Sequence, residues 1–185
     1  MFHRQYRLFC VFLFLLLTVA VSSCPLLAQP DPPKPHPQVQ ALLDKGKAAL
    51  AASPSRSEEA LRLYNEALET SRTLKDRVGE ASVLLDIGQL YNNTSQLQKA
   101  LEFYEQALPI YRQAGDKVGE ARALMNVGIV TKDIGQPQKA LELYEQALSL
   151  FRKSGYKMGE ARVLNNIGLV YQGTGQPQKA LEFYQ

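Results

Sequence analysis

Apolar and small residues recur along residues 116–155 with the spacing of two amphipathic helices. In the first half they stand three and four residues apart, which places them on one face of a helix. These positions are Ala121, Leu124, Val127, Gly128 and Thr131. The second half repeats this spacing at Ala140, Leu141, Tyr144, Ala147 and Leu148. The pattern therefore predicts two helices, each with one face buried.

The residues between the two halves predict a tight turn. Gly135 can adopt the left-handed conformation that ends a helix, and Pro137 suits the first turn of the next one. Gly155 ends the second helix in the same way. Gly128, Ala140 and Ala147 are small enough to let two helices approach closely, with Tyr144 filling the space beside them. We expect Ala140 at the closest approach.

This unit recurs at intervals of 40 residues. The stretch GQPQKALELYEQAL at 135–148 is matched by SQLQKALEFYEQAL at 95–108 and by GQPQKALEFYQ at 175–185. The stretch VGEARALMNVGIV at 118–130 has counterparts that begin at Val78 and Met158. A fixed period of this length indicates stacked supersecondary units. The sequence thus predicts an all-α fold of antiparallel helix pairs.

The repeated residues resemble the tetratricopeptide repeat. The matching residues of the middle unit are Leu124, Val127, Gly128, Ala140, Tyr144 and Ala147. Those of the unit before are Leu84, Ile87, Gly88, Tyr91, Ala100, Tyr104 and Ala107, and those of the unit after are Leu164, Ile167, Gly168, Tyr171, Ala180 and Tyr184. Leu replaces the first-helix Trp of the motif. The 40-residue period resembles the long-repeat subgroup of kinesin light chains and spindle-orientation adaptors. The resemblance implies a right-handed superhelix, an α-solenoid, whose first helices line a concave groove.

The repeats define the expected segments of the chain. Residues 1–23 (or 1–28) read as a signal peptide and 24–37 as a proline-rich spacer. Residues 38–75 form a degenerate first repeat that lacks the glycine of the first helix. Complete repeats follow at 76–115 and 116–155, and the repeat at 156–185 stops within its second helix. We expect the short last helix to leave Ala180, Leu181 and Tyr184 without a covering unit. This uncovered end suggests self-association of the protein. It also suggests that the sequence is the amino-terminal fragment of a longer protein.

The first residues predict export. A basic start with Arg4 and Arg7 precedes an apolar stretch at 8–21, which is shorter than the ~20 residues of a membrane-spanning helix. The run from Val21 to Cys24 resembles a bacterial lipobox, in which Cys24 would be lipidated. Cleavage after Ala28 and an uncleaved anchor are the alternatives, and Cys24 would then be a spectator. We expect a membrane-anchored lipoprotein on the periplasmic side, or a secreted or periplasmic protein.

Local exceptions carry further expectations. Pro30–Pro37 should be an extended spacer, with a disordered leader as the plain alternative. Ser55 and Glu58 fit a capping box. Ser95 replaces the turn glycine and could cap the following helix. Pro109 lies inside a second helix and should kink it or end its regular hydrogen bonding early.

Composition argues against several classes of function. The net charge is +3, and the Lys and Arg residues interleave with Glu without a basic stripe, so nucleic acid is not indicated. Both cysteines and both histidines precede the repeats. The repeats therefore offer no catalytic constellation, metal site or cofactor motif. We expect a membrane contact only through the signal or lipid anchor.

What remains is a binding surface on the first helices. Arg122 and Asn126 stand four residues apart, as do Arg162 and Asn166, so each pair shares one helix face. An amide donates and accepts hydrogen bonds, and a guanidinium engages a carboxylate. The expected peptide-binding residues are Arg122, Asn126, Ile129, Arg162, Asn165, Asn166 and Leu169. Met125 and Leu85 should face the same groove. The plain alternative is that both arginines only pair with Glu on neighbouring helices.

Ser82 and Asp86 replace the Arg–Asn pair in the preceding unit, which predicts a neutral or acidic amino end of the groove. The sequence thus favours a non-catalytic scaffold that binds an extended peptide, which can be acidic, or a partner protein. The alternative is the sensor arm of a larger exported enzyme, because exported bacterial proteins that resemble this chain often continue from such repeats into a caspase-like (CHAT-type) protease domain.

Overall fold

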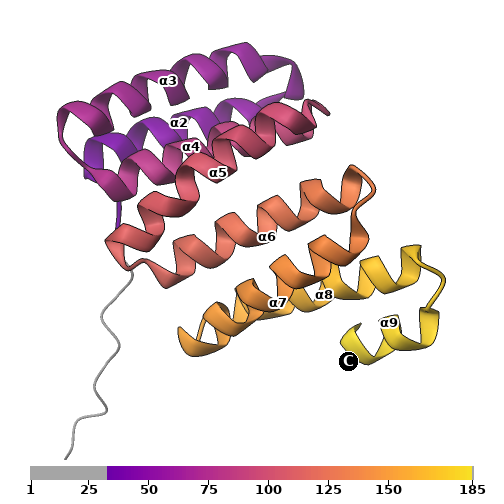
Figure 1. The fold of residues 1–185 in the computed structure, drawn as a ribbon. Helices are drawn as coiled ribbons and strands as arrows, with labels where there is room; N and C mark the ends of the chain where they lie inside the picture. Colours follow the sequence, from indigo (N-terminus) through magenta and orange to yellow (C-terminus); the bar gives the residue numbers. More distant parts are fainter. Residues whose placement is uncertain (1–32, 185) are drawn as a thin grey trace, which may run out of the picture. The chain divides into compact units, whose positions relative to one another are not determined.

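A computed structural model describes residues 33–184. These residues form helices joined by short turns, and no strand occurs among them. The helices follow one another in chain order (Figure 1). They are α2 (Pro37–Ala52), α3 (Ser57–Thr73), α4 (Arg77–Asn93), α5 (Leu97–Ala114), α6 (Lys117–Asp133), α7 (Pro137–Lys153), α8 (Lys157–Gly173) and α9 (Pro177–Tyr184), with a 3-10 turn η1 (Pro54–Arg56) before α3. The expected all-α fold is confirmed.

Helix contacts show how the pairs stack. Each helix packs against the next one along the chain, and the first helix of each pair also touches the first helix of the following pair, as α4 touches α6. In the part of the chain that the structure describes, no second helix contacts another second helix. The first helices α2, α4, α6 and α8 therefore lie closer together than the second helices do. We call the surface that they share, on the side away from the second helices, the first-helix face.

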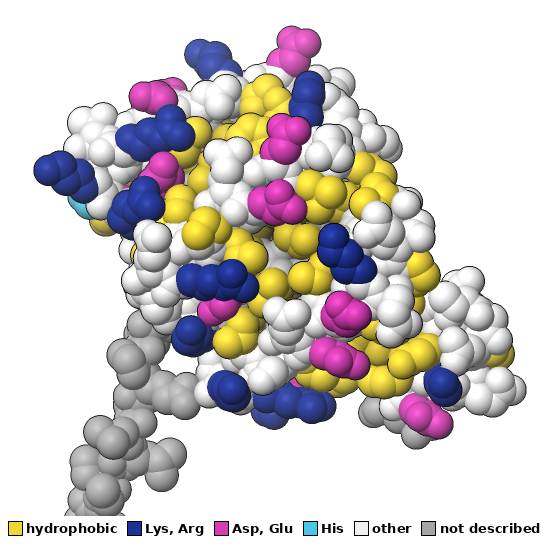
Figure 2. Space-filling model, viewed as in Figure 1, with side chains coloured by type: hydrophobic (Ala, Val, Ile, Leu, Met, Phe, Trp, Pro, Cys, Tyr) yellow, Lys and Arg dark blue, Asp and Glu magenta, His cyan; other side chains and the backbone are white. Residues whose placement is uncertain are grey.

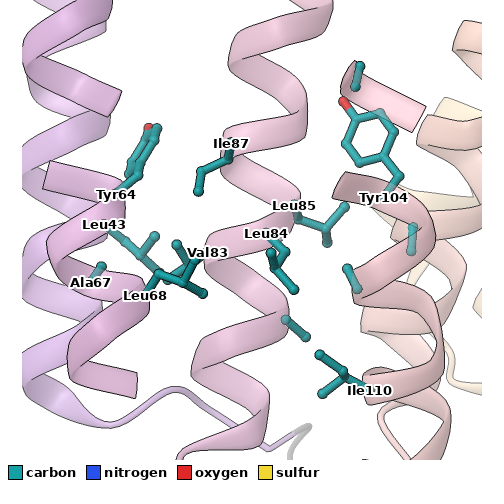
Figure 3. Close-up of a cluster of buried hydrophobic side chains, with 14 of the residues drawn as sticks. Leu43, Tyr64, Ala67, Leu68, Val83, Leu84, Leu85, Ile87, Tyr104 and Ile110 are labelled. Carbon is teal, nitrogen blue, oxygen red and sulfur yellow. The ribbon is translucent and has the colours of Figure 1, made fainter. Parts of the chain in front are cut away.

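The core forms between neighbouring helices because each first helix has apolar residues on two sides. In α4, Val83 and Ile87 point toward α3, where Val83 lies beside Leu68, whereas Leu85 points toward Tyr104 of α5 (Figure 3). All five side chains are buried. Full burial of one such side chain stabilises the fold by about 1.5–3 kcal/mol. A first helix is thus held by the pair before it and by its own partner.

Glycine and tyrosine meet at the closest approach within each pair. A methyl group on Gly88 would lie 2.5 Å from the ring of Tyr104, and one on Gly128 would lie 2.6 Å from the ring of Tyr144. Real Cβ atoms do not come this close, so only glycine fits. Ala140 is fully buried beside this contact. The structure confirms the close packing expected from the small residues.

The first pair has the same contact, which corrects the sequence analysis. A methyl group on Gly46 of α2 would collide with the ring of Tyr64 in α3. The first repeat therefore does not lack the glycine of the first helix. Two additional residues separate this glycine from its tyrosine, because η1 lengthens the connection between the helices. The insertion shifts the register and hides the match in the sequence.

Each turn after α3 uses one left-handed residue. Gly135 has φ +84° and Gly155 has φ +68°, as predicted. Ser95 occupies the same position before α5 with φ +59°. The residue next to α5 is Gln96, and no side chain caps the helix there. The prediction that Ser95 caps α5 is therefore wrong, because this serine is needed for the reversal of the chain.

The predicted capping box at Ser55 and Glu58 is also wrong. Helix α3 begins at Ser57, and the residue before it, Arg56, makes no capping hydrogen bond. Ser55 lies inside the 3-10 turn, where its backbone N–H donates to Oγ of Ser53 at 3.3 Å. The serine cluster thus stabilises the turn instead of the helix.

Pro109 does not end its helix early. Helix α5 runs from Leu97 to Ala114 with the proline inside it. Pro109 is exposed, whereas its neighbour Ile110 is buried. The backbone bond that proline cannot donate is thus missing on the solvent side of the helix. The buried contacts on either side of it, through Ala107 and Tyr111, keep the helix continuous.

At the two ends of the described chain, the start of α2 and the burial of Ala180 differ from the expectations. Pro33–His36 lie outside any helix, but Pro37 is the first residue of α2. In α9, Leu181 is 59% exposed and Tyr184 is 43% exposed, as expected, whereas Ala180 is buried against α8. The signal peptide, Cys24 and both cleavage sites fall outside the described residues. Among the helices described, none combines the length and the apolar character needed to cross a membrane.

Candidate functional site

The glycine–tyrosine contacts align the four first helices residue by residue. Counting from each glycine gives three rows across the first-helix face, one residue from each helix. The rows are Gln40, Ser82, Arg122 and Arg162; Asp44, Asp86, Asn126 and Asn166; and Lys47, Gln89, Ile129 and Leu169. Within each helix these residues lie four and three apart, so they share one side. The predicted site residues other than Asn165 belong to these rows.

The arginines of the first row lie at the surface. Arg122 and Arg162 are both exposed, and neither forms an ion pair within residues 33–184. The glutamates at the start of α6 and α8 bind other cations: Arg112 Nε donates to Glu120 and Arg152 Nε donates to Glu160, each at 2.9 Å. Among the described residues, neither groove arginine forms an ion pair with a neighbouring glutamate.

The amides of the second row are half-buried beside these arginines. Asn126 and Asn166 make no side-chain hydrogen bond within the described part of the chain, so their donors and acceptors are available. Ile129 in the third row is half-buried, and Leu169 is 42% exposed. The carboxyl half of the first-helix face, on α6 and α8, thus combines a cation, an amide and an apolar side chain from each helix.

Two residues expected on this face are buried. Leu85 is 2% exposed and Met125 is 8% exposed, and each belongs to a buried hydrophobic cluster. The corresponding residue of α8, Asn165, is exposed, since no further first helix covers it in the described chain. Asn165 therefore lies at the border of the face, where it can contact a ligand only from the side.

A pocket of about 160 Å³ opens on the amino half of the face. The helices α2, α4, α5 and α6 contribute to it, and the segment Pro33–Pro35 forms a further wall. Its polar residues are Lys34, Gln40, Lys47, Ser82, Asp86, Tyr111, Asp116 and Arg122. The structure thus brings Arg122 together with residues that stand up to 88 positions away in the sequence.

The pocket is not simply acidic, which corrects the expectation for the amino end. Asp86 is largely buried and forms a 2.8 Å ion pair with Lys47 of α2. Burial raises the pKa of Asp86 above its ordinary value, while Lys47 and Arg122 act against this change. Lys47 was missed because the shifted register of the first repeat concealed that it belongs to the third row.

Two hydroxyl groups complete the polar wall. Ser82 Oγ and Tyr111 Oη lie 3.1 Å apart and form a hydrogen bond in which either can donate. Whichever donates, the proton of the other hydroxyl is left for a third group. Burial raises the pKa of Tyr111 to about 12, so this side chain keeps its proton at neutral pH. The pair is therefore a hydrogen-bond donor toward the pocket.

Acidic and basic side chains interleave over the face drawn in Figure 2, without a patch of one sign. Among the described residues, no group of His, Cys, Asp and Glu is arranged to hold a metal ion. The site offers charged and amide groups on rigid helices, which is suited to binding an extended polar ligand.

Comparison with known proteins agrees with this architecture. The profile of the tetratricopeptide repeat family matches residues 40–113 and 119–185, which is well over half of the chain. No curated protein matches the sequence significantly.

Several solved structures are similar in fold. BtubC (BKLC) from P. vanneervenii has a TM-score of 0.62 and 22% identity over 80% of this chain and 69% of its own. A putative kinesin light chain with TPR-like repeats from Podosopora anserina has a TM-score of 0.65 and 20% identity, over 80% of this chain and 72% of its own. The Rap conjugation gene regulator of plasmid pLS20, solved with the Phr* peptide, has a TM-score of 0.68 and 20% identity over 79% of this chain. The present chain spans 40% of that regulator.

Proposed function

The chain belongs to the tetratricopeptide repeat family, and from this premise we propose that it is a non-catalytic scaffold that binds an extended peptide along its first-helix face. The observation that carries this proposal is the state of Arg122 and Arg162. Both guanidinium groups are exposed and unpaired within the described chain, each beside a half-buried amide four residues further on. Charged groups without partners on a rigid surface favour a ligand of opposite charge.

The proposed ligand is an acidic peptide. Equivalent residues of α6 and α8 lie side by side because these helices touch, so an extended chain can meet both arginines in turn. Asn126 and Asn166 can each donate to and accept from the ligand backbone. Ile129 and Leu169 add apolar contact next to them. The similar Rap regulator was solved with a peptide, which supports a peptide as the class of ligand.

The test is a selection followed by a matched pair of variants. Peptides are selected from a random library on the full 185-residue chain, and the tightest is measured by calorimetry. A charged hydrogen bond contributes about 1.5–3 kcal/mol. The double variant Arg122→Glu with Arg162→Glu should therefore weaken binding at least about tenfold, on the order of 1.4 kcal/mol.

The control is Arg62→Glu with Lys139→Glu. Both of these residues are exposed on second helices, and the change in net charge is the same. Binding should then fall by much less than in the first double variant. Selected peptides that are basic or purely apolar would overturn the proposal, as would equal losses in the two double variants.

We also propose that the segment before the repeats exports the protein and that Cys24 anchors it by a lipid. The basis is the sequence alone, namely the basic start, the apolar stretch and the run from Val21 to Cys24. The chain should label with a fatty-acid analogue and fractionate with membranes, and Cys24→Ser should abolish the labelling. A soluble wild-type chain that begins at Gln29 would contradict the lipid anchor.

A further inference from the structure

We propose that the last helix pair, α8 and α9, binds the same pair of a second copy of this chain, so that two copies associate about a twofold axis. The surface involved, which we call the end face, consists of five exposed residues that each have a buried or half-buried equivalent in α6 or α7. They are Met158, Ala161, Asn165, Leu181 and Tyr184. The proposal goes beyond peptide binding, because it concerns the end of the helix stack.

Comparison with the preceding pair shows what the end face lacks. Ala121 of α6 is fully buried, whereas the equivalent Ala161 of α8 is exposed. Leu141 of α7 is 8% exposed, whereas Leu181 of α9 is 59% exposed. The helices α6 and α7 both contact α8, but α8 and α9 contact no later helix in the described chain (Figure 1). The end face therefore exposes residues that have a covering neighbour in the preceding pair.

The exposed residues form a continuous apolar surface. Met158, Ala161 and Asn165 are spaced three and four residues apart, so they share one side of α8. Most of the large apolar side chains that are exposed in the described chain belong to this pair or flank it, namely Tyr156, Met158, Leu169, Leu181 and Tyr184. Apolar surfaces of this kind, with polar residues around them, mark protein interaction sites.

The amino end of the stack does not complement the end face. Val83 and Ile87 of α4 are buried and point toward α3, the preceding helix (Figure 3). Counting from the glycine of each helix, their equivalents in α2 are Ala41 and Lys45, both of which are exposed. A head-to-tail contact would bury the charge of Lys45 against apolar residues and leave space beside Ala41, and both are unfavourable. A second copy should therefore meet the end face with its own end face, which is the contact of a twofold dimer.

The charges beside the end face are complementary in this arrangement. Arg162 follows Ala161 in α8, and Glu182 follows Leu181 in α9. Both charged side chains are exposed, and neither forms an ion pair within residues 33–184. A half-turn about the direction of stacking lays α8 of one copy over α9 of the other. The same register then brings Arg162 to Glu182 of the second copy and the small Ala161 to the large Leu181.

The apolar residues should supply most of the affinity, and the charges should fix the register. The test is sedimentation equilibrium of the full 185-residue chain without peptide, in a mild detergent matched to the solvent density. The chain should change from one copy to two between about 1 μM and about 1 mM, as expected for a small interface.

Leu181→Glu should weaken this association at least about tenfold, because each copy then brings a carboxylate against apolar residues. The matched control is Ile134→Glu. Ile134 is 44% exposed in the turn between α6 and α7 and lies outside the end face, so this variant should associate like the wild type. Circular dichroism checks that both variants keep their helices.

Charge reversal tests the twofold arrangement with residues that are exposed and should not affect folding. Arg162→Glu and Glu182→Arg should each weaken the association about threefold, as expected for exposed ion pairs. An equimolar mixture of the two variants should recover it, because every contact between unlike copies again joins opposite charges. A chain that remains a single copy, equal losses in Leu181→Glu and Ile134→Glu, or a mixture that does not recover would overturn the proposal.

Discussion

The two complete repeats, α4–α5 and α6–α7, share their packing and differ in the surface that they offer. Gly88 packs on Tyr104 as Gly128 packs on Tyr144, and a methyl group added to these glycines would lie 2.5 and 2.6 Å from the respective rings. The first-helix face instead changes from Ser82 and Asp86 to Arg122 and Asn126. In α4 the polar groups are paired with each other or with neighbouring helices, whereas in α6 they are left for a ligand. Packing and recognition thus reside in different positions of the same repeat.

The exchange of Pro109 and Ser149 tests whether the two second helices are equivalent, and it has the largest expected effect. Both residues are exposed and occupy the same place in their helices. Ser149→Pro removes a backbone hydrogen bond inside α7 and should lower the free energy of unfolding by about 3 kcal/mol. Pro109→Ser should raise the free energy of unfolding by a smaller amount, because α5 is a continuous helix with the proline in place. Urea unfolding of both variants measures this, and a harmless Ser149→Pro would contradict the expected cost of losing a backbone hydrogen bond at this position.

Overpacking should affect both repeats alike. Ala100 and Ala140 are fully buried at equivalent positions. Replacing either with Leu should destabilise the protein by roughly 1–3 kcal/mol, because the added atoms have no space. Glu102→Leu and Glu142→Leu, two positions further on the exposed side, are the controls and should cost far less. Equal melting temperatures for Ala140→Leu and Glu142→Leu would contradict the helix faces described above.

The turns before α5 and α7 differ in the residue that adopts the left-handed conformation. Ser95 has φ +59° where Gly135 has φ +84°. Side chains are disfavoured in this region, so Ser95→Gly should stabilise and Gly135→Ser should destabilise by about 1 kcal/mol each. No atom lies within 4 Å of a methyl group on Gly135, so the effect reports the backbone alone. Thermal unfolding of the two variants should show shifts of opposite sign, and shifts of the same sign would refute the assignment.

The smallest expected effect is a change of the free energy of unfolding with pH that comes from Asp86 in α4. Burial raises the pKa of Asp86, so the folded protein binds this proton more tightly than the unfolded chain does. Stability contributed by this group therefore rises as pH falls through its folded pKa toward 3.8, the ordinary value. Asp86→Asn, which copies Asn126, should remove that gain.

Glu160 provides the control of opposite sign. Hydrogen bonds from Arg152 and Lys157 lower the pKa of Glu160, so its contribution is present above the ordinary value of 4.5 and is lost as pH falls through the folded pKa. Glu160→Gln should flatten the acid-induced loss of stability, whereas Asp86→Asn should steepen it. The urea midpoint measured from neutral pH down to about pH 3 distinguishes them, and parallel profiles would contradict the assigned shifts.

The sequence predicted those features that depend on local chemistry. Gly135 and Pro137 have the roles expected for a turn and a helix start, and Ala140 is buried, because each role follows from the residue and its neighbours. Gly46 was missed because a two-residue insertion changed the spacing on which the comparison of repeats depends. Ser95 was misassigned because serine caps helices far more often than it adopts positive φ.

Only part of the candidate site could be predicted, because only part of it depends on local spacing. The rows of Arg122 and Arg162 follow from helical spacing within one repeat. The pocket depends on how α2, α4, α5, α6 and the proline segment meet, and no local pattern indicates that Lys34 and Lys47 lie near Arg122. The spacing of Met125 predicts a place on the face, but this side chain belongs to a buried hydrophobic cluster.

The central claim is that recognition depends on the first-helix residues of α6 and not on its core. The most direct test gives α6 the residues of α4, through Arg122→Ser with Asn126→Asp, and measures the selected acidic peptide by calorimetry. The account predicts a loss of affinity of at least about tenfold. It also predicts a change of no more than about 0.5 kcal/mol in the free energy of unfolding, because neither side chain is buried in the core. Unchanged affinity in the folded variant would contradict the account.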